Sequence, residues 1–495
     1  MTTSQPEAIL KHLYCIRWYL CDFITLVMLL TFTIKNFRSF RGEQTLSMIA
    51  SGRQPDHSKH LARIPDDENQ ALPVAVVYGA NGAGKSNLVK AMLFLESLVL
   101  RGTEPKKPIG RRPFVLDKES MGLPTELSLQ FVEEGNVYAF GCKLNDRIVE
   151  AEWLSLLRNG KEIAVYERLT TDQGEVRIEP GPVLKDDTWG DHAKALALTR
   201  VGVLPNQLFL HVVGKTLREQ DQGPIIAGAL RWFMERLTII PADSPFSKLA
   251  QLVAHDTEFT SFAGDFLRRV ATGVDRLVVD SANVEETMLG PFKQIIDELP
   301  AGGTTTFPGP DGTELVVEKG EGTTVKLRTV HAEHLTPEGA RVKLPFSEES
   351  DGTQRVTHLL PALHSVCNQP GLFVIDEIDR SLHPLLAKGF VRAFLKACAG
   401  KGSQLIFTTH ETAFLDLDLL RRDEIWFADK KPPINATELY SLADYKVRTD
   451  LKIDKAYLQG RFEAVPPIEP ELPDWVRHIM DELKPRGVAA PLTAA

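Results

Sequence analysis

The sequence predicts an α/β fold in which a mostly parallel core sheet carries a phosphate-binding loop. Three apolar runs rich in β-branched residues, at 74–78, 371–375 and 404–408, have the composition of buried parallel strands. A glycine-rich G-x-x-x-x-G-K-S motif follows the first run directly, and an acidic pair follows the second. We therefore expect the motif and the acidic pair to form two halves of one site.

The phosphate-binding loop occupies residues 79–86, between the first strand and an apolar-periodic helix at 87–96. Its glycines let backbone N–H groups converge on phosphates, and the helix N-terminus adds a partial positive charge. We expect Lys85 to reach the β- and γ-phosphates and the Ser86 hydroxyl to bind Mg²⁺. A chance glycine-rich turn is the alternative, but it does not explain the flanking strand and helix. The nucleotide-binding residues expected here are Gly79, Asn81, Gly82, Gly84, Lys85, Ser86 and Asn87.

The acidic pair at the end of the second strand, Asp376 and Glu377, has the Walker B arrangement. We expect Asp376 to hold Mg²⁺ directly or through water, and Glu377 to polarise the attacking water. His410 follows the third strand, and we expect it at the γ-phosphate. Solvated carboxylates and a structural histidine are the alternatives. The order of these residues along the chain favours the catalytic roles.

The composition of the chain narrows the classes of protein to which it can belong. The 495 residues are 43% hydrophobic, enough for one large core or for two to three modules. A net charge of −9 argues against a uniformly basic nucleic-acid surface. The five cysteines are scattered and include no C-x-x-C pair, so we expect neither a disulfide framework nor a zinc site. A cytoplasmic location fits this cysteine usage best.

The first 27 residues precede the first regular pattern, a strand-like alternation at 30–34. Arg17 and Asp22 interrupt the apolar segment 13–30, and the longest uncharged run, 23–34, has 12 residues. A membrane-spanning helix needs about 20. An ordered extra helix, a membrane anchor and upstream sequence ahead of a natural start at Met28 are the three interpretations. We favour the last, and we expect no membrane segment.

The ordered motifs resemble those of the ABC-type ATPase heads of the SMC, RecF and OLD groups. The resemblance is closest to the bacterial AAA15-type ATPase family associated with abortive infection and phage defence. Together the motifs frame residues 30 to about 465, nearly the whole chain. Besides the phosphate loop, the stretches that carry the resemblance are 34–40, 349–355, 376–384, 409–410 and 455–462.

The resemblance implies a homodimer or higher homo-oligomer, in which two heads face each other head to tail and clamp ATP and Mg²⁺ between them. Ser350, Gly352 and Thr353 would form the signature segment that touches the γ-phosphate bound to the other subunit, and Asp379 would lie in the D-loop that crosses the interface. An ordinary polar turn is the alternative for the signature segment. Arg38 is expected either near the phosphates or as a surface residue.

Two parts of the family pattern are less well defined here. ABC heads carry a glutamine in a Q-loop after the β-rich lobe, and Gln130 and Gln207 are both candidates for it. No heptad pattern is long enough for a coiled coil, so we expect a compact helical insertion instead of long arms.

The expected domains are an N-terminal extension (1–27), an N-terminal ATPase lobe with an antiparallel side sheet (28–210), a mainly helical insertion (211–310), a C-terminal ATPase lobe (311–470) and a tail (471–495).

The resemblance implies a Mg²⁺-dependent ATPase that senses or regulates in anti-phage defence. Only 85 residues follow His410, too few for an appended Toprim nuclease domain, so we expect a separate nuclease or toxin as the effector. A nucleic acid or a phage protein would be the trigger. A RecF-like DNA-repair ATPase is the alternative, and ATP-stimulated, salt-sensitive DNA binding would favour it. An ATP-binding transporter subunit fits less well, because the insertion has no role there.

Overall fold

The computed structural model describes residues 26–52, 57–171, 173–185, 203–243, 248–285, 324–445 and 453–462, with shorter pieces at 246, 290, 293–297, 299, 303–308, 314–320 and 464. The expected N-terminal extension, apart from its last two residues, and the expected tail lie outside these residues. Among the described residues, no helix has the length and apolar character needed to span a bilayer.

The core sheet has the predicted parallel arrangement. Its strand order is β11-β17-β18-β5-β19-β20, and every neighbouring pair is parallel except the last. The three strands expected from the sequence are present as β5, β17 and β18, at the centre of the sheet. The strands are β5 (Val74–Tyr78), β11 (Leu237–Ile240), β17 (Leu372–Ile375), β18 (Gln404–Thr408), β19 (Ile425–Lys431) and β20 (Ala436–Ser441).

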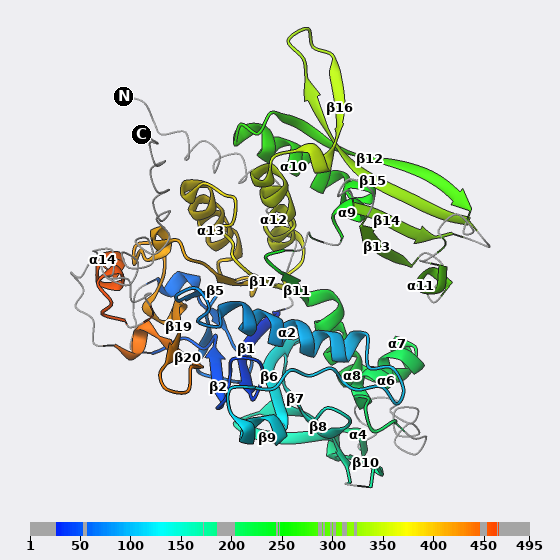
Figure 1. Cartoon of the computed structure of the whole chain (residues 1–495), viewed down its shortest axis with the longest axis vertical. Coiled ribbons are helices and arrows are strands. Elements are labelled where there is room, and N and C mark those ends of the chain that lie inside the picture. Colours follow the sequence, from blue (N-terminus) through cyan, green and yellow to red (C-terminus); the bar gives the residue numbers. More distant parts are fainter. Residues whose placement is uncertain are drawn as a thin grey trace, which may run out of the picture.

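Helices cover both faces of this sheet, with α12 (Asp351–Asn368) and α13 (Pro384–Cys398) on one side and α2 (Lys85–Leu100) on the other (Figure 1). Alternate residues of β5 pack into the two resulting cores. Val76 joins the core beneath α12 and α13, whereas Ala75 joins the core that contains α2. Burial on both faces is the reason that the strand is apolar throughout rather than alternating.

A seven-stranded antiparallel side sheet, in the order β10-β9-β8-β7-β6-β1-β2, packs against the α2 side of the core. This sheet is the antiparallel side sheet expected of the N-terminal lobe, and together with the parallel core it confirms the fold class. Its strands are β1 (Met28–Lys35), β2 (Gln44–Ser47), β6 (Thr125–Glu133), β7 (Asn136–Leu144), β8 (Val149–Arg158), β9 (Lys161–Thr170) and β10 (Val176–Pro180).

A fully buried polar cluster joins this side sheet to α6 (Phe209–Thr216). The carboxylate of Glu152 accepts hydrogen bonds from the amides of Phe209 and Leu210 at 2.6 and 2.9 Å, so it satisfies two free N–H groups at the helix start. Arg168 lies beside it and donates to the carbonyls of Val149 and Pro205. The cluster anchors α6 to the sheet at a position remote from the phosphate loop.

The region between the two ATPase lobes differs from the expected, mainly helical insertion. The helices are present as α8 (Pro224–Arg231), which continues into the π-helical turn η3 (Trp232–Arg236), α9 (Leu249–His255) and α10 (Thr257–Arg269). However, β11 in this region belongs to the core sheet, and a second antiparallel sheet follows α10. Its strands are β12 (Val274–Glu285), β13 (Thr304–Pro308), β14 (Glu314–Lys319), β15 (Thr324–Leu335) and β16 (Arg341–Pro345).

The reason for this difference is long-range pairing. β12 pairs with β15 from Val274↔His334 to Glu285↔Thr324, across a separation that short sequence windows do not reveal. Leu277 and Ala332 of this pair pack on Phe259 and Leu267 of α10, so helix and sheet form one lobe (Figure 1). The remaining short elements are η1 (Ser58–His60), β3 (Ala62–Arg63), β4 (Gln70–Ala71), α3 (Lys118–Gly122), α4 (Pro182–Lys185), α7 (Glu219–Gln222), α11 (Lys293–Asp297), η6 (Phe346–Glu348), η7 (Thr412–Phe414), η8 (Arg422–Glu424), η9 (Leu442–Asp444) and α14 (Ile453–Leu458).

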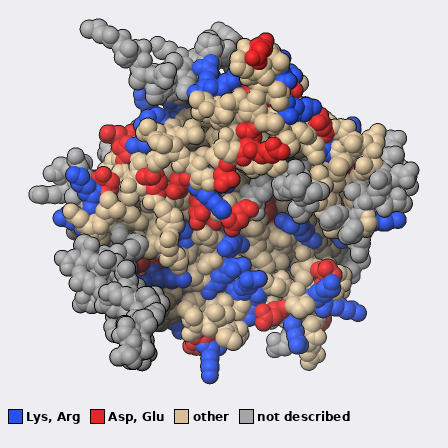
Figure 2. Space-filling model, turned by 45° about the horizontal axis from the view of Figure 1, so that its top comes forward, with Lys and Arg blue, Asp and Glu red and all other residues tan. Residues whose placement is uncertain are grey.

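The surface carries charges of both signs. On the face drawn in Figure 2, acidic and basic side chains are interspersed and no uniform basic coat covers it. This distribution agrees with the net charge of −9.

Candidate active site

The phosphate loop connects β5 to α2, as the sequence predicts, and Gly84 caps the helix in a left-handed conformation with φ 113°. A β-carbon on Gly84 would lie 2.1 Å from Thr437 Oγ1, and one on Gly79 would lie 2.3 Å from the Ala428 carbonyl oxygen. Only glycine fits at these two positions. Gly82 faces open space, where a ligand has access to the loop.

Side chains from two distant segments, together with Asn87 at the start of α2, hold this loop in place. Asn87 Nδ2 donates to Ser39 Oγ at 2.8 Å, and Thr437 Oγ1 lies 2.7 Å from both Ser39 Oγ and the Ala83 carbonyl oxygen. Asn87, expected to contact the nucleotide, therefore helps to fix the loop. No sequence motif points to Thr437, because it lies about 350 residues beyond the loop on β20.

Lys85 lies almost entirely inside the protein, with 5% of its surface exposed. Its ammonium donates to the carbonyls of Gly79 and Ala80 at 2.8 and 3.2 Å. Burial lowers the pKa of Lys85 to about 8, against the opposing effect of nearby carboxylates led by Glu377. The positive charge is thus held where water solvates it poorly, and phosphate oxygens would stabilise it.

A short chain of hydrogen bonds joins the phosphate loop to the ends of β17 and β18. Ser86 Oγ donates to Asp376 Oδ1 at 3.2 Å, and Thr408 Oγ1 donates to the same oxygen at 2.6 Å. Asp376 is buried, with 4% of its surface exposed. A hydroxyl and a carboxylate within contact distance are oxygen ligands of the kind that Mg²⁺ takes together with phosphates. The donor set therefore fits the predicted magnesium ion.

Glu377 follows directly and adopts a left-handed backbone conformation, with φ 49°. Its amide donates to Thr408 Oγ1 at 2.8 Å, which links it to the chain described above. His410 lies two residues after β18, with one part of its surface open to solvent and the rest covered by the protein. Partial burial and the nearby Lys85 ammonium lower its pKa, so the imidazole is neutral at pH 7. The structure thus brings five predicted site residues together where the phosphate loop meets the carboxyl ends of β17 and β18: Lys85, Ser86, Asp376, Glu377 and His410.

The signature segment begins a helix instead of forming an isolated turn. Ser350 caps α12, and its Oγ accepts a hydrogen bond from the Thr353 amide at 3.2 Å. Thr353 is buried, whereas Ser350 is exposed and Gly352 is half-buried. Ser350 and the Gly352 amide are therefore the groups that another molecule could reach. The described contacts join this segment to the loop after β17, where a β-carbon on Gly352 would lie 2.9 Å from the Ser381 carbonyl oxygen.

Arg38 lies beside the phosphate loop, next to Ser39. Its backbone is left-handed (φ 51°), its amide donates to the Arg112 carbonyl at 2.7 Å, and its guanidinium lies 5.7 Å from the centre of the Phe37 ring. Burial and Arg112 lower the pKa of Arg38. Its Nε, like Asp379 Oδ1, is buried without a hydrogen-bond partner among the described residues.

The two Q-loop candidates lie elsewhere. Gln207 Nε2 donates to the Thr103 carbonyl, beyond the C-terminal end of α2. This helix has 16 residues and is about 24 Å long, so Gln207 lies far from the phosphate loop at its other end. Gln130 pairs with Thr31 inside the side sheet. No described contact brings either glutamine to the phosphate loop.

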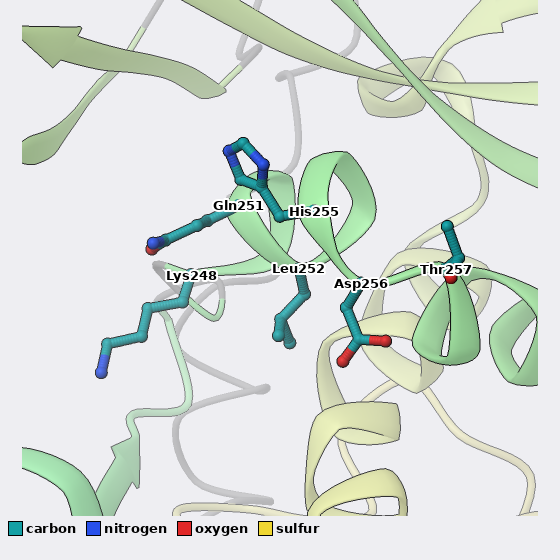
Figure 3. Close-up of a pocket in the computed structure, with 6 residues that line it drawn as sticks. All are labelled: Lys248, Gln251, Leu252, His255, Asp256 and Thr257. Atoms are coloured by element: carbon teal, nitrogen blue, oxygen red, sulfur yellow. The ribbon is translucent and has the colours of Figure 1, made fainter. Parts of the chain in front are cut away.

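A separate pocket lies in the insertion, at the junction of α9 and α10 (Figure 3). None of its lining residues belongs to the phosphate loop or to the acidic pair. The nucleotide site is therefore distinct from this pocket, which is lined by Lys248, Gln251, Leu252, His255, Asp256 and Thr257.

The parallel core, the loop between β5 and α2 and the acidic pair after β17 define a P-loop ATPase head of the ABC type. A family model described as "AAA domain, putative AbiEii toxin, Type IV TA system" matches residues 74–195 and 240–416, more than half of the chain. The chain belongs to this family, which confirms the resemblance to ATPases of abortive infection. No curated protein matches the chain.

Several solved structures are similar over most of the chain. An SMC head bound to the C-winged helix domain of ScpA is 14% identical, with 84% of this chain and 97% of that chain covered and a TM-score of 0.34. The SMC head domain from Thermotoga maritima is 13% identical (84% and 98% covered, TM-score 0.31). An Smc head domain with an extended coiled coil, bound to a ScpA domain derived from Pyrococcus furiosus, is 14% identical (88% and 100%, TM-score 0.32). At these TM-scores the fold assignment rests on the topology of the chain itself.

Replacing Gly84 by alanine should destabilise the free protein more than replacing Gly82. Both residues have a positive φ, but only the new β-carbon at position 84 meets Thr437. We expect Gly82→Ala to lower the free energy of unfolding by about 1 kcal/mol through backbone strain alone, and Gly84→Ala to lower it by about 3 kcal/mol or more. Denaturant unfolding without nucleotide measures both. Equal losses would contradict the tight fit of the loop against β20.

Nucleotide binding at pH 8.5 should take up protons. Free Lys85 has a pKa of about 8, and bound phosphates favour its charged form, so the nucleotide complex holds more protons than the free protein and affinity falls as the pH rises above 8. Calorimetric titration with ADP in two buffers of different ionisation enthalpy should show uptake of up to about one proton per nucleotide. Lys90→Met, which removes an exposed cation of the same helix, should keep this uptake. Binding without uptake would show that Lys85 is already fully charged.

Proposed function

We propose that the protein is a Mg²⁺-dependent ATPase whose two copies clamp ATP between them and which regulates a separate nuclease or toxin in anti-phage defence. The hydrogen-bond chain from Ser86 through Asp376 and Thr408 to Glu377 carries the catalytic part of this proposal. This chain supports a magnesium-binding role for Ser86 and Asp376 and a water-polarising role for Glu377, beside the loop that would bind the phosphates.

Each residue of the site has its own role in the proposed hydrolysis of ATP. The loop amides and Lys85 bind the β- and γ-phosphates, and Ser86 with Asp376 would hold Mg²⁺, which neutralises charge on those phosphates. Glu377 accepts the proton of the attacking water. Thr408, at the end of the neighbouring strand, holds the Glu377 backbone and so helps to orient the carboxylate. Neutral His410 donates a hydrogen bond to the γ-phosphate and helps to stabilise charge there.

The second subunit supplies what this site lacks. Ser350 is exposed at the start of α12, and free amides at a helix start favour binding of an anion. The described contacts of the signature segment lead to the loop after β17 and not to the phosphate loop of the same chain. A head-to-tail homodimer would bring Ser350 and Gly352 to the γ-phosphate held by the partner subunit.

Family membership supports the link to toxin–antitoxin defence systems. The matching model is described as a putative AbiEii toxin of a type IV toxin–antitoxin system. A nucleic acid or a phage protein is the proposed trigger. The DNA-repair alternative has less support, since acidic and basic groups are interspersed on the face in Figure 2 and the net charge is −9.

Glu377→Gln should slow ATP hydrolysis by about 100-fold or more while ATP still binds, because the amide keeps the shape of the side chain but cannot accept the proton. ATP should then hold the variant as a dimer in light scattering. Glu438→Gln, on the outer strand β20, should hydrolyse ATP like the unchanged protein. Rapid turnover by Glu377→Gln would place the water-polarising residue elsewhere.

Two inactive variants should complement each other in trans. Lys85→Ala loses the phosphate contact and Ser350→Arg blocks the signature segment, yet a mixed dimer retains one site with both parts intact. An equal mixture should recover up to about a quarter of the unchanged activity, since half of randomly paired dimers are mixed and each has one working site. Steady-state ATPase assays after mixing measure this. A mixture as inactive as either variant would contradict a composite site.

A further inference from the structure

Arg355 is a buried charged residue that the roles described above leave without a function. It lies on α12, one helical turn after Gly352, and only 8% of its surface is exposed. Its Nη2 donates to the backbone carbonyls of Asp376 at 2.7 Å and of Glu377 at 2.9 Å. A guanidinium removed from water and directed at two backbone oxygens constrains the position of that backbone.

The surroundings of Arg355 indicate that this constraint is specific. Burial lowers its pKa, and its Nε has no hydrogen-bond partner among the described residues, so stability alone does not explain an arginine here. An apolar side chain of similar length would fill the same space at lower desolvation cost. Only a hydrogen-bond donor, however, can hold the two backbone carbonyls in position.

These carbonyls belong to a strained part of the site. Glu377 has φ 49°, a conformation that non-glycine residues rarely adopt and that persists only where neighbours enforce it. Thr408 Oγ1 holds its amide from the core strand β18, and Arg355 holds its carbonyl from α12. The direction in which the Glu377 carboxylate points depends on both contacts.

The same turn of α12 carries the signature segment. Ser350 caps the helix, Gly352 packs against the Ser381 carbonyl, and Gln354 Nε2 donates to the carbonyls of Ser347 and Glu349 at 3.1 and 2.8 Å. Residues within one hydrogen-bonded helical turn move together. A displacement of Ser350 and Gly352 is therefore transmitted to the two carbonyls through Arg355.

We propose that Arg355 is a positioning residue that couples the signature end of α12 to the carboxylate of Glu377 in the same subunit. When Ser350 and Gly352 engage the nucleotide held by the partner subunit, Arg355 sets the Glu377 backbone in the geometry that polarises water. Each subunit thereby hydrolyses its own ATP fastest once it has met the ATP of the other. This inference rests on the proposed nucleotide sandwich and adds the route by which the two sites communicate.

Arg355→Met tests the coupling, because methionine fills the space without a donor. We expect kcat to fall at least tenfold while the affinity for a non-hydrolysable ATP analogue stays within about threefold, since Arg355 lies outside the phosphate contacts. The Hill coefficient for ATP should fall to about 1. Arg355→Lys retains one donor and should recover part of kcat, which also covers the case in which Arg355→Met does not fold.

A double-variant cycle separates positioning from general stability. If Arg355 acts through Glu377, adding Arg355→Met to Glu377→Gln should lower kcat by less than twofold further. The amide introduced by Glu377→Gln cannot accept the proton, so the position of its backbone no longer affects the rate. As a matched control, Arg168→Met removes another buried arginine that grips backbone carbonyls, and it should lower thermal stability without changing the Hill coefficient.

Three results would overturn the inference: an unchanged kcat in Arg355→Met and Arg355→Lys, a loss that multiplies fully with that of Glu377→Gln, or a parallel loss of ATP affinity. These failures are distinguishable from failure of the proposed function, in which the unchanged protein itself would not hydrolyse ATP.

Discussion

The contact between the Ser86 hydroxyl and the Asp376 carboxylate is the interaction on which the structure of the site depends. It joins two segments 290 residues apart, and it can form only because β5, β18 and β17 lie side by side and parallel, so that their carboxyl ends meet at one edge of the sheet. Thr408, on the strand between them, hydrogen-bonds to Asp376 and to the amide of Glu377. The phosphate loop and the residues proposed to bind magnesium and to polarise water are all positioned by this arrangement.

The same region keeps charge and strain that a purely structural core would avoid. The Lys85 ammonium is buried, Glu377 is left-handed, and the Arg355 guanidinium is withdrawn from water. Such features lower stability and persist where function requires them. At the ends of β17 and β18 these features lie together beside the phosphate loop, whereas the buried Glu152 carboxylate caps α6 at a position remote from it.

Local sequence was sufficient for the parts of the fold that short segments define. The apolar runs of β5 and β18, the glycine loop and the acidic pair are continuous in sequence, and each has a physical signature of its own. The pairing of β12 with β15 in the second sheet was not predicted, because the two strands lie about 50 residues apart in the sequence. The roles of Ser39, Thr437 and Arg355 were not predicted for a related reason. Each of these residues acts through a contact with a segment that is distant in the sequence, and the neighbouring sequence does not indicate such a contact.

A structure of the protein with a non-hydrolysable ATP analogue and Mn²⁺ would test the account most directly, because the anomalous signal of manganese locates the metal independently of the protein. The account predicts a single peak beside the terminal phosphates at about 2.1 Å from Ser86 Oγ, with Asp376 bound to the metal or to one of its waters. Nucleotide in the loop with the metal away from Ser86 and Asp376 would contradict the assignment on which the mechanism rests.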